Sequence, residues 1–490
     1  MRRRALDVRS VIGWILLLLA ALFALALALG IARRAADRAA KRAVHRFHAR
    51  VNRFKLTRKP YIRTTLLGDP EVASAVRRHA AETGITEEKT WARVDTYIDE
   101  IVPHFNILAY YKFGYAFSRF VINFLYKVSV DYEDLVTLEA LPDDASVIYL
   151  INHRSNADYV VVAYVLAGDV SISYAVGEWA RAFPLEYVFK SFGSYFIRRK
   201  YREPLYHTLL ERYVQLITRN GVTQGIFPEG GLSRDGHLRP AKIGLLDYAL
   251  GVARDSAYSR RMHIIPVSLN YDRVLEDRTL LRELAKHETG ARVPKLRQAM
   301  EVLHYVGWNA LRLATGRWRK YGRVAVTIGR PMPVEPWLAE QRAAHGDFFA
   351  LPREQRLPAV QVLCDRVMTR IGELIPVTPV PLACAAIQSF DSDFIPRAAL
   401  IERMSEMREV LLELNGHVLR ADRDITETFD RAWRMLEMRK MLVEQGGGFA
   451  VLPSQRELVS YYANSIAHLL GPFERGVRER DAFPAVFGDR

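Results

Sequence analysis

Residues 146–166 read SVIYLINHRSNADYVVVAYVL and combine a predicted strand, a polar loop and a predicted helix. The five residues that follow Ser146 are apolar and rich in β-branched side chains, which is typical of a buried strand. Residues 157–166 continue as an apolar helical segment. A polar loop joins the two and carries His153 and Asp158, five positions apart. Loops that follow the strands of an α/β sheet collect functional groups, so the stretch predicts a candidate site in an α/β domain.

Further strands and helices alternate along the chain after this stretch. The predicted strands are 171–176, 222–227, 263–269 and 323–328. The predicted helices between them include 204–218 and 244–253. This alternation favours a sheet flanked by helices, so we expect an α/β domain over residues 140–335. Regions 64–139 and 336–490 show mainly helical periodicity and are predicted to be helical, which fits the two or three units expected of 490 residues.

The N-terminal region has a different composition. Residues 1–63 carry a net charge of +14 out of +15 for the whole chain, so the rest is nearly neutral. Residues 11–32 contain no charged side chain, and a helix of that length, about 33 Å, spans a bilayer. The apolar core of a cleaved signal peptide is usually shorter. We therefore expect a transmembrane anchor, with a cleaved signal as the alternative.

Basic residues flank the predicted span on both sides. Seven follow it between Arg33 and Arg50 and four precede it, which predicts a single-pass protein of the cell membrane with its body in the cytoplasm. Apolar residues recur at helical spacing through residues 36–54. This spacing predicts an amphipathic helix lying on anionic membrane lipid, and a solvated basic linker is the alternative.

Several chemistries find no support in the sequence. It contains no G-x-S-x-G elbow, Walker loop, H-E-x-x-H or G-x-G-x-x-G motif. Cys364 and Cys384 have no C-x-x-C pairing and no histidine cluster beside them, so we expect neither a disulfide framework nor a metal site. The nearly neutral body argues against nucleic-acid binding.

The loop at 152–158 can support acid–base chemistry. A hydrogen bond from one imidazole nitrogen of His153 to the Asp158 carboxylate would leave the other nitrogen free to accept a proton. Such a pair can activate a substrate hydroxyl without a protein nucleophile. Spacing alone is weak evidence, because His417 and Asp422 have the same separation in a helical region, where we expect no catalytic role.

Three further motifs follow His153 in order, at residues 193–199 (GSYFIRR), 227–234 (FPEGGLSR) and 264–267 (IIPV). Together with NHRSNAD, this series resembles the four acyltransferase blocks of the glycerolipid acyltransferases, in the form found in the glycerol-3-phosphate and dihydroxyacetone-phosphate branch. Residues 456–470 (RELVSYYANSIAHLL) are similar to the C-terminal signature of the bacterial membrane-bound glycerol-3-phosphate acyltransferases. The resemblance covers about 140–335 strongly and 390–470 more weakly.

The resemblance implies an acyltransferase-type sheet and a role for each block. In that family the histidine is the general base and the aspartate orients it, which assigns these roles to His153 and Asp158. The residues beside the histidine and those of the second and third blocks are implied to bind substrate. They are Arg154, Ser155, Arg198, Arg199, Glu229, Gly230, Gly231, Ser233, Arg234 and Lys242.

One position departs from the family pattern. The family usually has arginine in the third block where this chain has Leu232. Either Arg199, Arg234 or Lys242 supplies the missing charge, or the acceptor is not glycerol 3-phosphate.

The resemblance implies transfer of a fatty acyl group from acyl-CoA or acyl-carrier protein to the sn-1 hydroxyl of glycerol 3-phosphate, giving lysophosphatidate. No metal or other cofactor is expected, and the expected partners are membrane lipid and these substrates. Acylation of lysophosphatidate or dihydroxyacetone phosphate is the alternative that Leu232 leaves open. A membrane-tethered scaffold with an inactive acyltransferase fold is the second alternative.

Overall fold

The computed structural model describes residues 59–103, 115–166, 172–177, 186, 189–190, 193–198, 201–289 and 320–471. Within these residues, no helix is both long enough and apolar enough to cross a membrane. The predicted span at 11–32 lies outside them, as do Arg199 and residues 33–58 of the basic segment.

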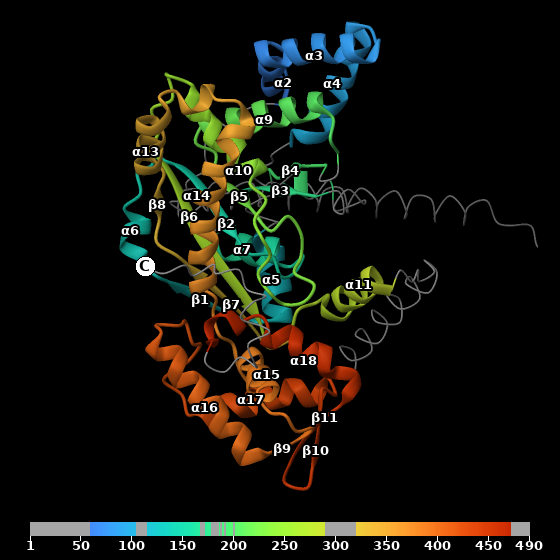
Figure 1. Ribbon diagram of the computed structural model, residues 1–490, viewed down its shortest axis with the longest axis vertical. Coiled ribbons are helices and arrows are strands. Elements are labelled where there is room, and N and C mark those ends of the chain that lie inside the picture. The colour runs from blue at the N-terminus through green and yellow to red at the C-terminus, as the bar shows by residue number, and fades with distance from the viewer. Residues whose placement is uncertain are drawn as a thin grey trace, which may run out of the picture.

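A mixed sheet of eight strands lies at the centre of the described chain (Figure 1). Its order is β1-β7-β6-β2-β5-β3-β4, and β8 pairs with β6. The strands are β1 (Lys127–Tyr132), β2 (Ser146–Ile151), β3 (Ser173–Val176), β4 (Tyr195–Phe196), β5 (Gln224–Ile226), β6 (Met262–Tyr271), β7 (Arg323–Ile328) and β8 (Met332–Pro333).

Strand direction changes once along the main path of this sheet. Pairing is parallel from β6 through β2, β5 and β3 to β4, antiparallel between β6 and β7, and parallel again between β7 and β1. The carboxyl ends of β2, β5 and β6 therefore share one edge of the sheet with the amino ends of β7 and β1. The loop that carries His153 leaves β2 at this edge.

The predicted strands at 146–151 and 323–328 have the same bounds in the structure, as β2 and β7, and each of their residues is buried. Alternate residues of β2 enter two different hydrophobic cores, because Tyr149 packs in one and Ile148 in the other. A strand covered on both faces reads as a continuous apolar run, which is why the sequence identified it.

Helices form both cores. The core that contains Ile148 receives α2 (Lys59–Leu67), α3 (Pro70–Thr83), α4 (Glu87–Ile101), α9 (Pro204–Arg219), α10 (Gly244–Leu250), α13 (Glu335–His345) and α14 (Arg353–Glu373). The core that contains Tyr149 receives α5 (Tyr115–Leu125), α7 (Asp158–Leu166) and α11 (Asp277–Thr289), and the helices of the C-terminal region. The short α6 (Leu135–Glu139) follows β1.

Two boundaries differ from the sequence prediction. The last residues of the basic segment begin α2, where Lys59 pairs with Asp99 at 2.9 Å and Arg63 pairs with Asp95 at 2.8 Å, both on α4. These two cations therefore dock a helix on the protein. β1 lies in the region predicted to be helical. Its mixed polar and apolar sequence suits a partly exposed edge strand, which gave a weak signal.

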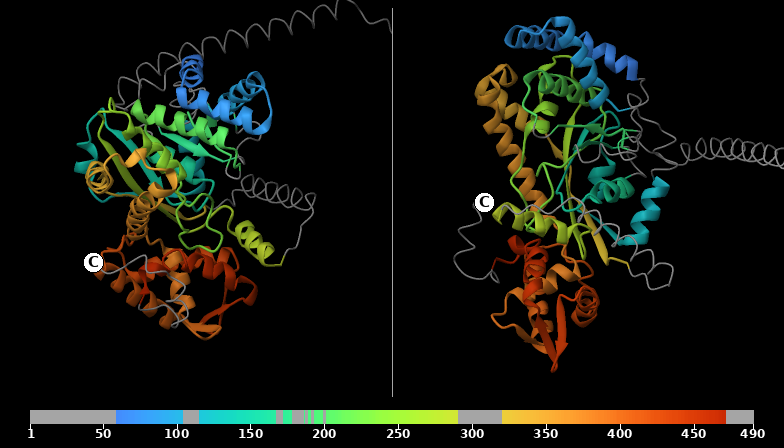
Figure 2. Two further views of the ribbon diagram at one scale, coloured as in Figure 1. Left: turned by 45° about the horizontal axis from the view of Figure 1, so that its top comes forward. Right: turned by 90° about the vertical axis from the view of Figure 1, so that its right-hand side faces the viewer.

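Residues 379–471 form a lobe at the end of the molecule opposite α2, α3 and α4 (Figure 2), whereas α13 and α14 of the predicted C-terminal region pack in the core that contains Ile148. The lobe contains α15 (Pro379–Gln388), α16 (Arg397–Glu413), α17 (Ile425–Met438), α18 (Arg456–Ala463), and a three-stranded sheet of β9 (Phe394–Pro396), β10 (Leu442–Gln445) and β11 (Gly448–Val451). The region was predicted to be wholly helical. Gly446 and Gly447 make the β10–β11 turn with positive φ angles, so the glycine run marks a hairpin.

Candidate active site

His153 and Asp158 lie together at the carboxyl end of β2. His153 Nδ1 is 2.9 Å from Asp158 Oδ2, and both side chains are buried. Asp158 is the first residue of α7, and its Oδ2 also accepts the backbone N–H groups of Arg154 at 2.7 Å and Ser155 at 3.0 Å. The carboxylate thus folds the loop around itself, as side chains at helix amino ends commonly do.

A second group supports Asp158 from the neighbouring strand. The hydroxyl of Tyr271, the last residue of β6, donates to Asp158 Oδ1 at 2.5 Å. Burial, together with the negative charge of Asp158, raises the pKa of Tyr271 well above its usual value, so this phenol remains a donor. Both oxygens of Asp158 are therefore occupied, and the carboxylate cannot rotate freely.

The imidazole ring of His153 is fixed by aromatic neighbours. Phe227 lies against it with ring centroids 4.2 Å apart, and Tyr159 meets it edge to face at 5.4 Å. Nε2 has no hydrogen-bond partner among the residues that the structure describes. With Nδ1–H donating to Asp158, Nε2 carries the lone pair that can take up a proton.

Glu229 ties the third block to His153. Its carboxylate accepts the backbone N–H of His153 at 2.7 Å and that of Arg239 at 3.0 Å. Burial raises the pKa of Glu229 to about 7, although both amides and the charge of Arg154 oppose the shift. The backbone N–H of Ser233 donates to the carbonyl of His153 at 3.1 Å, so the third block holds this residue on both its amide and its carbonyl side.

The third-block loop is itself tightly folded. The hydroxyl of Ser233 donates to the carbonyl of His237 at 2.7 Å and accepts the amide of Gly236 at 3.1 Å. Gly230 has φ +65°, and a Cβ there would come within 2.7 Å of Cδ of Lys242. Lys242 therefore lies over Gly230, beside Gly231, and is exposed. Its position suits contact with an anion, whereas Ser233 is buried and shapes the loop.

Arg154 is buried between this loop and the C-terminal lobe. Its guanidinium donates to the carbonyls of Gly236 and, at 3.3 Å, Ser465. Both terminal nitrogens of Arg154 are thus taken by backbone carbonyls, which assigns it a contact within the protein in place of the predicted contact with substrate. Asn464 strengthens the junction by donating to the carbonyl of Asp235 at 2.8 Å. The C-terminal YYANS signature therefore holds the third-block loop.

Arg198, Arg234 and Ser155, which were also predicted to bind substrate, each contact a different acidic residue. Arg198 is engaged by Glu100 of α4 through hydrogen bonds of 2.8 and 2.6 Å, with its guanidinium 4.7 Å from the ring centre of Tyr201. Arg234 is half-exposed, with a 3.4 Å ion pair to Glu283. Ser155 donates to Glu276 at 2.7 Å, which braces the loop after His153.

Sequence reasoning missed three residues of the site: Tyr271, Glu276 and Arg239. Tyr271 is the last residue of β6, and Glu276 lies in the loop that follows it. Functional groups collect where the strands of an α/β sheet end, so this position could have indicated both residues. Arg239 follows the third block and donates to the carbonyl of Leu232 at 3.3 Å. Its guanidinium therefore lies beside the position where the family arginine is missing.

The matched pair His417 and Asp422 behaves differently. His417 lies 3.2 Å from Asp131 rather than on Asp422, and it sits at the surface. Equal spacing therefore produces a buried histidine–aspartate pair only where a strand and a helix enclose the loop. Within the described ranges, no cluster of three or more histidine, cysteine, aspartate or glutamate side chains could hold a metal ion.

Comparison with known proteins places two domains on this chain. Residues 134–270 match the acyltransferase family model, and residues 308–472 match the glycerol-3-phosphate acyltransferase C-terminal region. The glycerol-3-phosphate acyltransferase of Aeromonas hydrophila is 28% identical over 85% of this chain and 50% of its own length. That of Shewanella pealeana is 26% identical over 83% of this chain and 49% of its own length. The chain thus spans about half the length of these curated relatives.

A solved structure, the 1-acyl-sn-glycerophosphate acyltransferase PlsC from Thermotoga maritima, is 20% identical and covers 53% of this chain and 78% of its own, with a TM-score of 0.30. Agreement at that level supports no structural argument. The two domain matches do correspond to the structure, because the first contains the His153 loop and the third block, and the second contains the lobe that holds them. The resemblance that the motifs indicated is therefore confirmed: one part of the chain matches the acyltransferase family model, and a following part matches the glycerol-3-phosphate acyltransferase C-terminal region.

Proposed function

We propose that the protein transfers a fatty acyl group from a thioester to a hydroxyl of glycerol 3-phosphate. The observation that carries the proposal is the buried His153–Asp158 pair with Nε2 available, in a loop held by the third block and the C-terminal signature. The names of the relatives, all glycerol-3-phosphate acyltransferases, support the choice of acceptor.

The proposed reaction is direct transfer. Nε2 of His153 removes the proton of the acceptor hydroxyl while the oxygen forms a bond to the thioester carbonyl carbon. The tetrahedral intermediate then expels the thiolate, which takes the proton back from His153 and leaves as a free thiol. Asp158 holds the imidazole in the required tautomer and stabilises the imidazolium that forms between the two steps. No acyl group becomes attached to the protein.

The acceptor phosphate needs cations near the third block. Lys242 is exposed over Gly230, Arg239 lies beside the backbone of Leu232, and Arg234 is half-exposed. We propose that these three side chains receive the phosphate and that Arg239 replaces the missing family arginine. Arg198 then serves to fix the second block to α4 through Glu100.

Transfer to the sn-1 hydroxyl, with acyl-CoA or acyl-carrier protein as donor, would yield lysophosphatidate. This product is an amphiphile that partitions into lipid. We propose that residues 11–32 anchor the enzyme in the cell membrane and that its body faces the cytoplasm, as the uncharged run and its basic flanks suggest.

An acceptor panel tests this proposal. Thiol release from palmitoyl-CoA is measured with the purified full-length protein and glycerol 3-phosphate, dihydroxyacetone phosphate or lysophosphatidate. We expect glycerol 3-phosphate to give the highest kcat/KM, and Arg239→Ala to raise its KM about 10- to 150-fold, the loss typical of a charge-assisted hydrogen bond. Thiol release that is independent of all three acceptors would contradict the proposal.

Leu232 supports one competing reaction, acylation of lysophosphatidate. Its side chain is half-buried and packs against an apolar core, where an acyl chain on the acceptor could also lie. If that reaction is the native one, lysophosphatidate will outcompete glycerol 3-phosphate, and Leu232→Arg will reverse the preference.

A further inference from the structure

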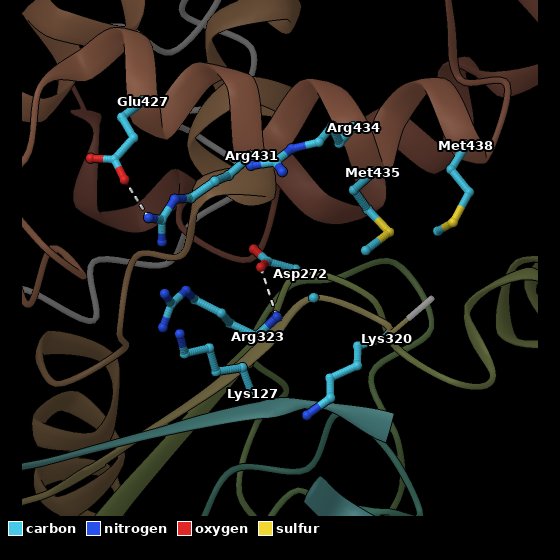
Figure 3. Close-up of a pocket in the computed structure, with 10 residues that line it drawn as sticks. Lys127, Asp272, Lys320, Arg323, Glu427, Arg431, Arg434, Met435 and Met438 are labelled. Atoms are coloured by element: carbon cyan, nitrogen blue, oxygen red, sulfur yellow. Dashed lines mark hydrogen bonds and ion pairs between the residues drawn. The ribbon is translucent and has the colours of Figure 1, made fainter. Parts of the chain in front are cut away.

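A second concave site lies at the same edge of the sheet as His153, beyond β6. This open cavity, of about 550 Å³, lies between α17 and the amino ends of β1 and β7. Figure 3 shows Arg431 and Arg434 on the helix facing Lys127, Lys320 and Arg323 across the cavity. None of these residues belongs to the site around His153.

Positive charge dominates the wall of this cavity. Only two of the lining residues are acidic, against the five cations. Asp272 is buried and is satisfied by backbone, since it accepts the amides of Arg323 at 2.8 Å and Val380 at 3.2 Å. Glu427 is paired with Arg431 at 2.5 Å. The remaining cations therefore have no carboxylate partner in the cavity.

The individual contacts agree with this account. The side chains of Lys127 and Lys320 have no hydrogen-bond or ion-pair partner among the described residues, and Arg434 contacts only the carbonyl of Asp430, at 3.1 Å. Repulsion from Arg323 is the main cause that lowers the pKa of Lys127. Cations held this close, without a counter-charge, are stabilised when an anion binds between them.

The size and the other wall indicate what kind of anion fits. A volume of about 550 Å³ lies in the range of sites for small organic ligands. Met435 and Met438 line one end with adaptable thioethers, which suit a planar organic group. The combination points to a phosphorylated organic molecule rather than to a bare inorganic ion.

We propose that this pocket binds an organic molecule with two or more phosphate groups, and that its occupant is the adenosine bisphosphate end of a coenzyme A thioester. The identity of the occupant rests on the proposed function. Strands in a sheet lie about 4.8 Å apart, and β7 and β1 begin about four residues beyond the point on β6 that pairs with the end of β2, so their amino ends lie roughly 16 to 20 Å from that end. His153 lies in the loop that follows the end of β2.

The arm of coenzyme A can bridge this separation. From its sulfur to its first phosphorus it contains thirteen bonds, a little more than four extended residues or roughly 14 to 16 Å, and the diphosphate and ribose extend it further. A thioester at His153 and a nucleotide in the pocket can therefore belong to one molecule. An acyl-carrier protein has the same arm but no adenosine bisphosphate, so the pocket favours coenzyme A as the donor.

Calorimetric titration of the full-length protein with adenosine 3′,5′-bisphosphate tests the proposal. The test variant is Lys127→Gln/Arg434→Gln, which removes two cations that have no ion-pair partner among the described residues. The control is Lys440→Gln, an exposed lysine just after α17 that does not line the pocket. We expect Kd to rise at least tenfold in the double variant and to stay within twofold in the control. The KM for palmitoyl-CoA should rise in parallel, with the KM for glycerol 3-phosphate unchanged.

Thermal unfolding checks that the double variant is folded, and the single variant Lys127→Gln replaces it if it is not. Absence of binding in the wild type, equal Kd values in all variants, or binding of pyrophosphate without the bisphosphate would each overturn the proposal. If the bisphosphate binds more weakly to the double variant but the wild type transfers no acyl group, the pocket assignment stands and the proposed function is contradicted. If the wild type transfers acyl groups but the Kd for the bisphosphate is the same in all variants, only the pocket assignment is contradicted.

Discussion

Both carboxylate oxygens of Asp158 are occupied. The partners of one oxygen could be predicted from the sequence, and the partner of the other could not. The amides of Arg154 and Ser155 are neighbours in the sequence, so the strand–loop–helix pattern was enough to predict the pair with His153. Tyr271 lies 113 residues away and reaches Asp158 only because β6 pairs with β2. Sequence spacing carries no record of that pairing, so this support could not be predicted.

Tyr271→Phe should lower kcat about tenfold with little change in either KM, because it removes one donor that orients Asp158 and leaves the substrate contacts in place. Tyr126→Phe is the matched control. Its ring lies 5.4 Å from that of Tyr271, and its hydroxyl donates to the carbonyl of Arg273 instead. Equal kcat values for the two variants would show that the Tyr271 hydroxyl has no positioning role.

Glu229 should make the stability of the protein depend on pH in a defined direction. Its pKa is about 7 in the folded protein against 4.5 ordinarily, so the folded state holds the proton more tightly. The contribution of this group to the free energy of unfolding is therefore complete below about pH 4.5 and is lost as pH rises to about 7. Urea unfolding from pH 5 to pH 7 should show a decline that is smaller in Glu229→Gln. Parallel declines in both proteins would exclude the effect.

α18 and the loop after it hold the candidate site from outside the region that matches the acyltransferase family model. Strands buried on both faces, such as β2 and β7, were predictable because continuous apolar runs survive in the sequence. The edge strand β1 and the short strands β9, β10 and β11 contain no such runs. β1 pairs with β7 and β9 pairs with β11, and both partners lie far away in the sequence. The YYANS signature was recognised by resemblance, but its contact with the third block required the structure.

Gly236→Ala tests how tightly this junction is packed. Gly236 has φ +95°, and a Cβ there would come within 1.9 Å of the carbonyl oxygen of Tyr461. We expect a loss of stability above about 3 kcal/mol, with loss of activity, because backbone lies on both sides of the clash. Gly446→Ala is the control, since that glycine also has a positive φ but has no atom within 4 Å. It should cost only about 1 to 2 kcal/mol. Similar losses in both variants would mean that the contact with α18 is loose.

The body of the protein consists of two cores on opposite faces of one sheet, extended by the C-terminal lobe, whereas its excess charge lies almost entirely in residues 1–63. Lys59 and Arg63 are engaged with α4, which leaves the preceding cations as the candidates for contact with lipid. The predicted division into an anchor and a catalytic body therefore rests on the distribution of charge as well as on the uncharged run at residues 11–32.

Deleting residues 1–32 should abolish membrane association that resists high salt and carbonate washes, and leave binding to anionic vesicles at low salt. The remaining basic residues attract anionic lipid, and added salt screens that attraction. Vesicle flotation at two salt concentrations measures the effect, with neutral vesicles as the control. A truncated protein that ignores anionic vesicles at low salt would show that the basic segment is only a linker.

His153 is the proposed general base of an acyl transfer to glycerol 3-phosphate. The most direct test measures glycerol-3-phosphate-dependent thiol release from palmitoyl-CoA by the wild type, His153→Ala and His417→Ala, with thermal unfolding as the check on folding. We expect His153→Ala to lose about 10²- to 10⁴-fold in kcat and His417→Ala to keep wild-type turnover. Near-normal turnover in a folded His153→Ala protein would contradict the account.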